Sequence, residues 1–355
     1  MKKIVLTGGG TAGHVTPNLA LLPSLQEAGF LITYMGSYDG IEKRLIEDFG
    51  IPYVGIATGK FRRYLDVKNL TDPFRVIKGY TEARKFLKEY RPDVVFSKGG
   101  FVSVPVVRAA ASLKIPCIIH ESDMTPGLAN KLCFPVAKKI CCNFPETFKM
   151  LPEEKAVLTG TPIRAELAQG NKLAGLEMCG FTANKPVIMV IGGSLGAMNV
   201  NKAVRDALPK LLEKYQVVHL CGKDKLDNLL LTTPGYKQFE YLKTELKDIF
   251  AMADIVISRA GANAICELLA LRKPNILIPL PASSSRGDQL LNAASFESQG
   301  FSIVLHEDDL TTTLLVDKVD ELYENRQNYL DAMENSGQMD SIPAIMELIK
   351  EAAGN

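Results

Sequence analysis

The sequence predicts an α/β protein of two Rossmann-like domains, each with a doubly wound parallel sheet, facing each other across a cleft. Two glycine-rich loops carry this prediction, Gly8-Gly9-Gly10-Thr11-Ala12-Gly13 and Gly192-Gly193-Ser194-Leu195-Gly196. Each follows an apolar run typical of a buried parallel strand, at 3–7 and at 187–191, and precedes residues with helical spacing. Such a strand, turn and helix form an anion site, because unpaired N–H groups and the positive end of the helix dipole converge there.

Length and composition agree with two soluble domains. A chain of 355 residues is too long for one ordinary core. Its seven cysteines include no Cys-x-x-Cys pair and lie mostly in apolar stretches, which indicates reduced core residues. The apolar run at the N-terminus is too short for a signal peptide, and we expect no transmembrane helix, since no run of about 18 apolar residues occurs.

In the first half, apolar runs alternate with helical spacing, which is typical of a parallel sheet. The strand candidates are 3–7, 30–35, 53–56, 93–96, 116–119 and 139–142. Helices are expected from near Pro17 to Gly29 and over 39–47. The glycine and proline residues of 158–164 indicate a crossover between domains, so we place the first domain at 1–162 and the second at 163–340.

The second half repeats the alternation, with strand candidates at 187–191, 216–220, 236–241, 254–258, 275–278 and 302–305. The last amphipathic segments, near 315–333 and 341–352, could pack back onto the first domain, although periodicity alone does not place them. In the domain assignment, the C-terminal helix of about 341–355 is the segment expected to pack back onto the first domain.

The first glycine-rich loop has a dinucleotide-binding spacing, Gly8-x-Gly10-x-x-Gly13. An NAD site would also need an acidic residue at the end of the second strand, and Met35-Gly36-Ser37-Tyr38 supplies none. His14 follows the third glycine at a helix start, which favours a catalytic or substrate-binding role over that of a merely satisfied histidine.

In the second half, small residues join a strand end to a helix start over 258–267. Glu267, one to two turns into that helix, could bridge two ribose hydroxyls or could be a solvated helix residue. Gln289 and Asn292 are three residues apart and therefore share a helix face, which suits sugar hydroxyls. No Asp-x-Asp motif and no cluster with metal-ligand spacing occurs, so we expect neither a metal site nor a resident cofactor.

Together, six segments in this order resemble the MurG family of peptidoglycan N-acetylglucosaminyltransferases, which have two Rossmann-like domains in the GT-B fold. The segments are Gly9–His14, Lys98–Ser103, His120–Asp123, Gly160–Arg164, Gly192–Gly196 and Asp288–Asn292. The resemblance implies transfer of GlcNAc from UDP-GlcNAc to the C4 hydroxyl of the muramyl sugar of lipid I, giving lipid II and UDP with inversion.

The resemblance leaves the general base open. His14 is the first candidate, and Glu121 or Asp123 could serve instead. This chain carries Ala12 where many relatives have a second glycine, and Ser122-Asp123 where some have Gln-Asn. The additional carboxylate of Asp123 is the reason for keeping several candidates.

The resemblance also implies a donor site mainly in the second domain. Uridine and ribose would lie at the 262–267 helix start, the phosphates at Ser194 and at Arg164 of the crossover, and uracil near Leu246. The first domain would close over the diphosphate or sugar. The complete set of candidate donor residues is Thr11, Ala12, Gly13, Arg164, Ser194, Leu246, Ala262, Asn263, Ala264, Ile265, Cys266, Glu267, Gln289 and Asn292.

The segment 60–91 holds ten cationic residues against four acidic ones, with aromatic residues between them. This composition suits an anionic membrane surface or a nucleic acid, or simply a solvated helix. Because lipid I stays in the cytoplasmic leaflet, the resemblance favours peripheral contact with the anionic cytoplasmic face of the cell membrane and no nucleic acid. The expected contact residues are Arg62, Arg63, Phe74, Arg75, Ile77, Lys78 and Tyr80.

Other functions share parts of this pattern. Another GT-B glycolipid transferase, such as one acting on diacylglycerol, would use the same donor loops and a membrane. A UDP-GlcNAc 2-epimerase would need no acceptor. An NAD-dependent oxidoreductase would depend on the first glycine-rich loop alone, and a non-catalytic sugar-nucleotide sensor would leave the acceptor motifs without a purpose.

Overall fold

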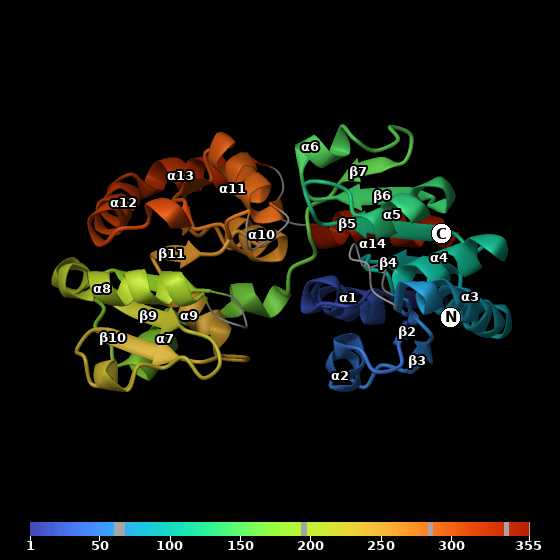
Figure 1. The fold of residues 1–355 in the computed structure, drawn as a ribbon, viewed down its shortest axis with the longest axis horizontal. Coiled ribbons are helices and arrows are strands. Elements are labelled where there is room, and N and C mark those ends of the chain that lie inside the picture. The colour runs from blue at the N-terminus through green and yellow to red at the C-terminus, as the bar shows by residue number, and fades with distance from the viewer. Residues whose placement is uncertain (60–67, 193–196, 283–286, 337–340, 355) are drawn as a thin grey trace. The chain divides into compact units, whose positions relative to one another are not determined.

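The computed structural model describes residues 1–59, 68–192, 197–282, 287–336 and 341–354. The predicted positions Arg62, Arg63 and Ser194 lie outside the described residues. The chain divides into two compact units, one of Met1–Arg164 with Asp340–Asn355 and one of Ala165–Met339. Both units are α/β, as the sequence predicts (Figure 1).

The first unit is built on a seven-stranded parallel sheet in the order β3-β2-β1-β4-β5-β6-β7. Its strands are β1 (Lys3–Thr7), β2 (Leu31–Ser37), β3 (Tyr53–Ile56), β4 (Val94–Ser97), β5 (Cys117–Glu121), β6 (Lys139–Cys142) and β7 (Ala156–Leu158). Six of them correspond to predicted strands. The sequence prediction missed β7, because this edge strand has three residues and none of them is buried.

Helices cover both faces of the first sheet, and each face has its own apolar core. One core contains residues of α1 (Thr16–Glu27) and α14 (Ser341–Ala352), and the other contains residues of α3 (Lys68–Tyr90) and α4 (Ser103–Ser112). Shorter helices are η1 (Ala12–His14), α2 (Ile41–Glu47), α5 (Leu128–Cys133), η2 (Phe134–Val136) and α6 (Pro145–Phe148).

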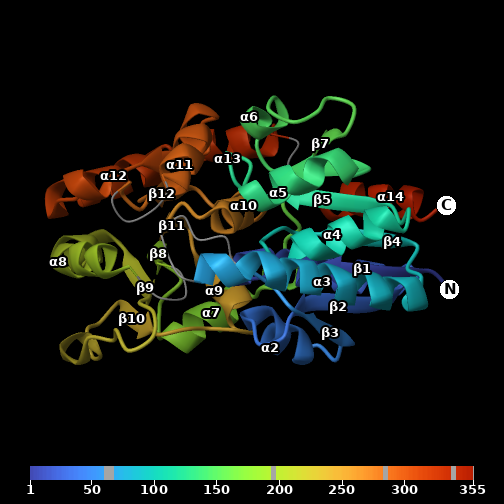
Figure 2. The ribbon, with the colours of Figure 1, turned by 45° about the vertical axis from the view of Figure 1, so that its right-hand side comes forward.

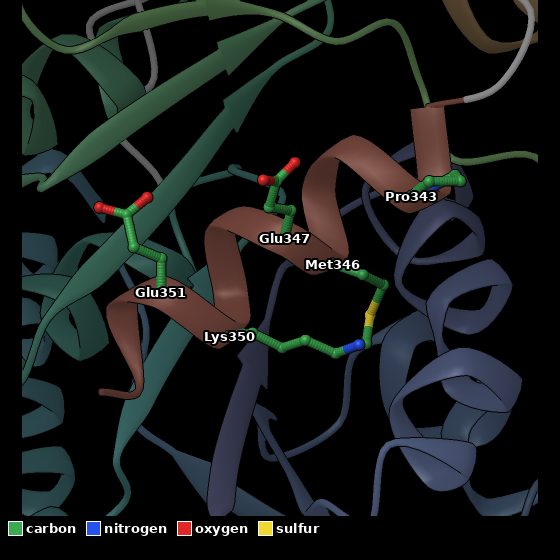
Figure 3. Close-up of a pocket in the computed structure, with 5 residues that line it drawn as sticks. All are labelled: Pro343, Met346, Glu347, Lys350 and Glu351. Carbon is green, nitrogen blue, oxygen red and sulfur yellow. The ribbon is translucent and has the colours of Figure 1, made fainter. Parts of the chain in front are cut away.

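The C-terminal helix α14 belongs to the first unit. It packs against α1, β4 and β5 (Figure 2). The side chains of Ile345 and Ile349 are fully buried. Its outer side borders a cavity of about 490 Å³, lined by residues that include Glu347 and Lys350 (Figure 3). Burial of one apolar face explains why the helix returns across the sequence to this sheet.

The second unit has a six-stranded parallel sheet in the order β10-β9-β8-β11-β12-β13. Its strands are β8 (Val187–Ile191), β9 (Gln216–Leu220), β10 (Tyr236–Phe239), β11 (Ile255–Ser258), β12 (Asn275–Leu277) and β13 (Ser302–Val304). All six correspond to predicted strands. The connecting elements are η3 (Ala165–Gln169), α7 (Lys172–Cys179), α8 (Met198–Lys214), η4 (Asn228–Leu230), α9 (Leu246–Met252), α10 (Ala262–Ala270), α11 (Asp288–Ser298) and η5 (Glu307–Asp309).

The predicted helical segment 315–333 is two helices, α12 (Thr312–Glu324) and α13 (Arg326–Glu334), separated at Asn325. The prediction that this segment could return to the first domain is wrong for α12, which packs against α8 and β12 of the second unit. Its residues Leu315, Val319 and Leu322 are buried in the core of that unit.

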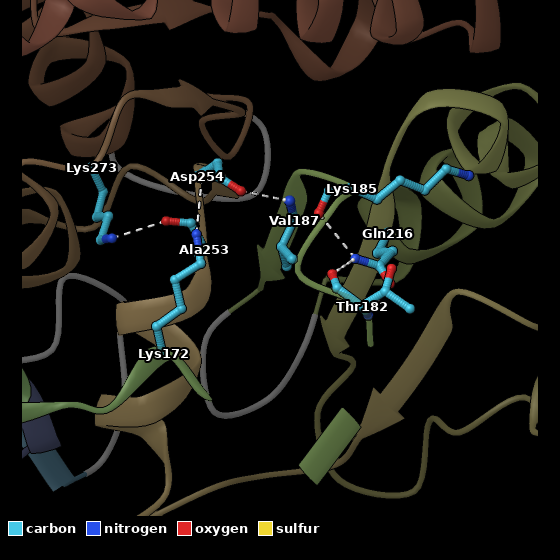
Figure 4. Close-up of polar contacts among 8 residues, drawn as sticks. All are labelled: Lys172, Thr182, Lys185, Val187, Gln216, Ala253, Asp254 and Lys273. Atoms are coloured by element: carbon cyan, nitrogen blue, oxygen red, sulfur yellow. Dashed lines mark hydrogen bonds and ion pairs between the residues drawn. The ribbon is translucent and has the colours of Figure 1, made fainter. Parts of the chain in front are cut away.

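Polar contacts pin together the strand starts of the second sheet (Figure 4). Asp254 accepts a hydrogen bond from the backbone N–H of Val187 at 2.8 Å and lies 3.8 Å from the ammonium of Lys172. The ammonium of Lys273 donates to the carbonyl of Ala253 at 2.9 Å. Burial lowers the pKa of Lys273 to about 8, partly opposed by the charge of Asp254. These contacts lie at the amino edge of the sheet, whereas Gly192 follows β8 at the opposite, carboxyl edge.

Candidate functional site

In the first unit, the loops that follow β1 and β4 meet at the carboxyl edge of the sheet. The two strands are paired, and each ends in a glycine-rich turn. A Cβ added to Gly100 would lie 2.3 Å from the carbonyl oxygen of Gly9, so this close approach requires glycine. The buried hydroxyl of Tyr34 donates to the carbonyl of Gly8 at 2.8 Å. The first loop is therefore held from several sides.

His14 is the last residue of η1, which follows the glycines of this loop. Its Nδ1 lies 3.1 Å from the Gly9 carbonyl oxygen and 3.1 Å from the Thr11 hydroxyl oxygen. Because a carbonyl only accepts hydrogen bonds, Nδ1 carries the proton and Nε2 keeps its lone pair. Burial, and next the positive charge of Lys98, lower the pKa of His14 to about 4. The ring is therefore neutral at pH 7, with Nε2 able to accept a proton.

Lys98 follows β4 and lies fully inside the protein. Its ammonium donates to His120 Nδ1 at 2.7 Å, to the Ser122 hydroxyl at 2.5 Å and to the Thr161 hydroxyl at 3.5 Å. His120 Nε2 in turn donates to the carbonyl of Gly160 at 2.8 Å. Burial, with the charge of Lys98, holds the pKa of His120 well below its ordinary value, so this histidine is a neutral acceptor for the ammonium.

The sequence reasoning assigned no function to Lys98 or His120, although both stand in segments that it singled out. The available signal was their position, since each lies at or next to the carboxyl end of a parallel strand. It also missed Glu42 of α2, which is completely buried against the first glycine-rich loop. Helical periodicity gives no reason to bury this glutamate.

Glu121 is the last residue of β5, and Asp123 lies in the loop that follows, on either side of Ser122, which accepts from Lys98. Glu121 is buried, and its two oxygens accept from the Asp123 N–H at 3.0 Å, the Gly127 N–H at 2.9 Å and the Asn130 amide at 2.9 Å. This carboxylate therefore anchors its own loop. The side chain of Asp123 is partly exposed.

In the second unit, the predicted donor residues of 262–267 follow the turn between β11 and α10, at the carboxyl edge of the sheet. Arg259 braces the turn by donating to the carbonyls of Ile278 at 3.0 Å and Pro279 at 3.3 Å and by pairing with Glu307. At the start of α10, Ala262, Asn263 and Ala264 are partly exposed, as is Glu267, whereas Ile265 and Cys266 are buried. A ligand at this helix start would meet the exposed residues and the backbone.

Gln289 and Asn292 of α11 are both tied to neighbouring loops. Gln289 accepts from the backbone N–H of Leu280 at 3.0 Å. The buried Asn292 donates to the carbonyl of Ala260 at 3.1 Å, and its Oδ1 has no hydrogen-bond partner among the described residues. Asn292 thus joins α11 to the turn before α10 and keeps one acceptor available.

The other predicted donor residues belong to several different elements. Leu246 is buried as the first residue of α9. Thr11 and Ala12 are exposed, and Gly13 and Arg164 are partly exposed. In the part of the chain that the structure describes, no group of three or more His, Cys, Asp or Glu residues could hold a metal ion.

The described part of the predicted membrane-contact segment is the helix α3. Phe74 and Ile77 are strongly exposed, at 75% and 60%, and Arg75 and Lys78 beside them are exposed as well. Tyr80 differs, because it is partly buried against the apolar core under α3. Among the described residues, none of the helices is long and apolar enough to cross a membrane.

Comparison with known proteins gives consistent matches. Residues 4–142 match the model of the glycosyltransferase family 28 N-terminal domain, and residues 187–349 match that of its C-terminal domain. The chain is 65% identical over 351 residues to the UDP-N-acetylglucosamine--N-acetylmuramyl-(pentapeptide) pyrophosphoryl-undecaprenol N-acetylglucosamine transferase of Lachnospira eligens, covering 99% of each chain. It is 64% identical, with the same coverage, to the protein of that name from Lachnoclostridium phytofermentans.

Among solved structures, MurG of Acinetobacter baumannii matches with a TM-score of 0.79 and 27% identity, over 99% of this chain and 100% of that one. A UDP-GlcNAc 2-epimerase from Methanocaldococcus jannaschii matches with a TM-score of 0.66 at 13% identity, over 99% of this chain and 100% of that one, and shares the fold alone. The predicted fold class is therefore confirmed, with two parallel-sheet domains of the GT-B type.

Proposed function

Because this chain belongs to the MurG family within glycosyltransferase family 28, we propose that it transfers GlcNAc from UDP-GlcNAc to lipid I, producing lipid II and UDP for peptidoglycan synthesis. The observation that carries this function is the 65% identity over essentially the whole of both chains. The acceptor is the C4 hydroxyl of the muramyl sugar, and the anomeric centre is inverted.

His14 is the proposed general base. Its Nδ1 proton is engaged by the Gly9 carbonyl, which leaves Nε2 to take the proton of the attacking hydroxyl. The C4 oxygen then bonds to the anomeric carbon of GlcNAc as the bond from that carbon to the UDP oxygen breaks. UDP departs with the electron pair. Glu121 is less suited to this role because both of its oxygens already accept hydrogen bonds, and Asp123 is the second candidate.

The second unit is the proposed donor-binding unit. The partly exposed residues at the start of α10 would meet uridine and ribose, with the Glu267 carboxylate accepting from ribose hydroxyls. Asn292 keeps an amide oxygen for a sugar hydroxyl, and the Arg164 guanidinium would oppose the diphosphate charge. Leu246, which is buried, would support the uracil site from beneath.

A product assay tests the reaction. Purified protein, UDP-GlcNAc and a short-chain lipid I analogue should give a β-1,4-linked disaccharide product and an equal amount of UDP by mass spectrometry. His14→Ala should lower kcat and leave UDP-GlcNAc binding intact, whereas Glu267→Ala should weaken UDP-GlcNAc binding. Glu213→Ala, at an exposed position of α8, is the matched control. Binding of UDP-GlcNAc without any product would reject lipid I as the acceptor.

The exposed face of α3 is the proposed contact with the anionic cytoplasmic face of the membrane. Phe74 and Ile77 can enter the interface while Arg75 and Lys78 attract anionic headgroups. The double variant Arg75→Glu/Lys78→Glu should bind less to vesicles containing anionic lipid, and Lys210→Glu, exposed on α8, should bind as the unmodified protein does. Equal binding of all three proteins would reject this surface.

A further inference from the structure

The carboxylate of Glu42 packs against the glycine-rich loop of the first unit and accepts a hydrogen bond from it. It lies in the first turn of α2 and is completely buried. One oxygen accepts from the backbone N–H of Gly10 at 3.2 Å. The other accepts from the backbone N–H of Ser37 at 3.0 Å and from its hydroxyl. A side-chain anion thus sits against a loop type that elsewhere receives phosphate.

The peptide that follows Gly9 is clamped between Glu42 and the second glycine-rich turn. A Cβ on Gly9 would lie 2.6 Å from the carboxyl carbon of Glu42, so the carboxylate packs directly against this glycine. On the other side, a Cβ on Gly100 would lie 2.3 Å from the Gly9 carbonyl oxygen and 3.3 Å from His14 Nδ1. The Gly9 carbonyl, which sets the direction of the His14 ring, therefore has little freedom.

Two buried charges of opposite sign also act on the His14 ring. The ammonium of Lys98 disfavours its protonated form, and the carboxylate of Glu42 favours it. Burial and the Gly9 carbonyl add to these effects, the first against and the second for the protonated ring. Glu42 is therefore connected to His14 both through the loop and through its charge.

We propose that Glu42 is a positioning residue for His14, an internal anion that fixes the Gly9 peptide so that the ring keeps Nδ1 protonated and presents Nε2 to the acceptor hydroxyl. The proposal rests on the proposed function, in which His14 is the base. It also means that the Gly10 N–H is engaged by the protein itself and is not offered to a substrate phosphate. This N–H group of the loop would therefore serve the position of the base.

Steady-state kinetics and ¹⁵N NMR of histidine-labelled protein test this role. Glu42→Ala should lower kcat about 100-fold, the effect of a displaced catalytic group, and should leave the KM for UDP-GlcNAc unchanged. The ¹⁵N shifts of its His14 should change from one Nδ1-protonated form to a mixture of tautomers. Glu42→Gln keeps a carbonyl oxygen for one N–H and should recover part of kcat. Glu47→Gln, exposed on the same helix, is the matched control.

Glu42→Asp covers the case in which Glu42→Ala does not fold, because it keeps the charge but is one methylene too short to reach the Gly10 N–H. It should show the same tautomer mixture and a lowered kcat. A single Nδ1-protonated His14 with unchanged kcat in either folded variant would overturn the proposal. His14→Ala separates the two hypotheses: if it retains full kcat, His14 is not the base, while the tautomer measurement still decides whether Glu42 positions the ring.

Discussion

The protonation state of His14 is the property of this site that can be measured most directly. The structure predicts that the ring stays neutral down to about pH 4. Lowering the pKa from 6.5 to about 4 corresponds to about 3 kcal/mol in favour of the neutral ring. Burial is the largest cause, and the positive charge of Lys98 comes next.

The same shift has a consequence for folding. Between pH 6.5 and about 4, the unfolded chain binds a proton at His14 and the folded protein does not. The free energy of unfolding therefore falls as the pH falls through this window, by up to about 3 kcal/mol from this residue. Above pH 6.5 the contribution is complete and does not change with pH.

An NMR titration of histidine-labelled protein measures the pKa. The chain has only four histidines, so the spectrum is simple, and the signal lost in His14→Asn identifies the residue. We expect His14 to be neutral and protonated on Nδ1 at pH 7 and to titrate near pH 4. In Lys98→Met, which removes the buried charge, its pKa should rise. A His14 that titrates near 6.5 in the unmodified protein, or that carries its proton on Nε2 at pH 7, would refute the reasoning.

Two further predictions concern the glycine-rich turn after β4 in the first unit and the amino edge of the sheet in the second unit. Gly100→Ala should lower kcat at least 100-fold, because the added Cβ would force the Gly9 carbonyl to move. Gly180 has a similar positive φ but open space around it, so Gly180→Ala should leave kcat unchanged. Equal effects of the two substitutions on kcat would contradict the steric argument. For Lys273, whose pKa of about 8 lies below the ordinary 10.5, the unfolded chain alone binds the proton between these values, so stability rises with pH there. In urea unfolding, the free energy of unfolding of the unmodified protein should increase by about 3 kcal/mol relative to that of Lys273→Met between pH 7 and 10.5. A constant difference between the two proteins would reject the buried-charge account.

Local sequence determined most of the secondary structure. Buried parallel strands are continuous apolar runs, and glycine-rich sequences follow β1, β4 and β8, so 12 of the 13 strands that the structure describes could be predicted without knowing their partners. Periodicity did not predict one short strand, and it did not show that the segment 315–333 is two helices. The strand β7 is short and unburied, and the break at Asn325 depends on helix termini that an amphipathic pattern does not reveal.

The motifs also named His14, because a histidine next to a glycine-rich turn has few structural reasons to be there. Only the tertiary structure decided what surrounds it. Glu42 reaches the Gly10 N–H from 32 positions away along the chain, and the Lys98 ammonium reaches His120 and Thr161 across 22 and 63 positions. These contacts arise because neighbouring parallel strands bring their carboxyl ends to one edge. The sequence by itself thus determined the elements and the family of this protein, whereas the charges that set the protonation state of its histidine come from strand order and burial.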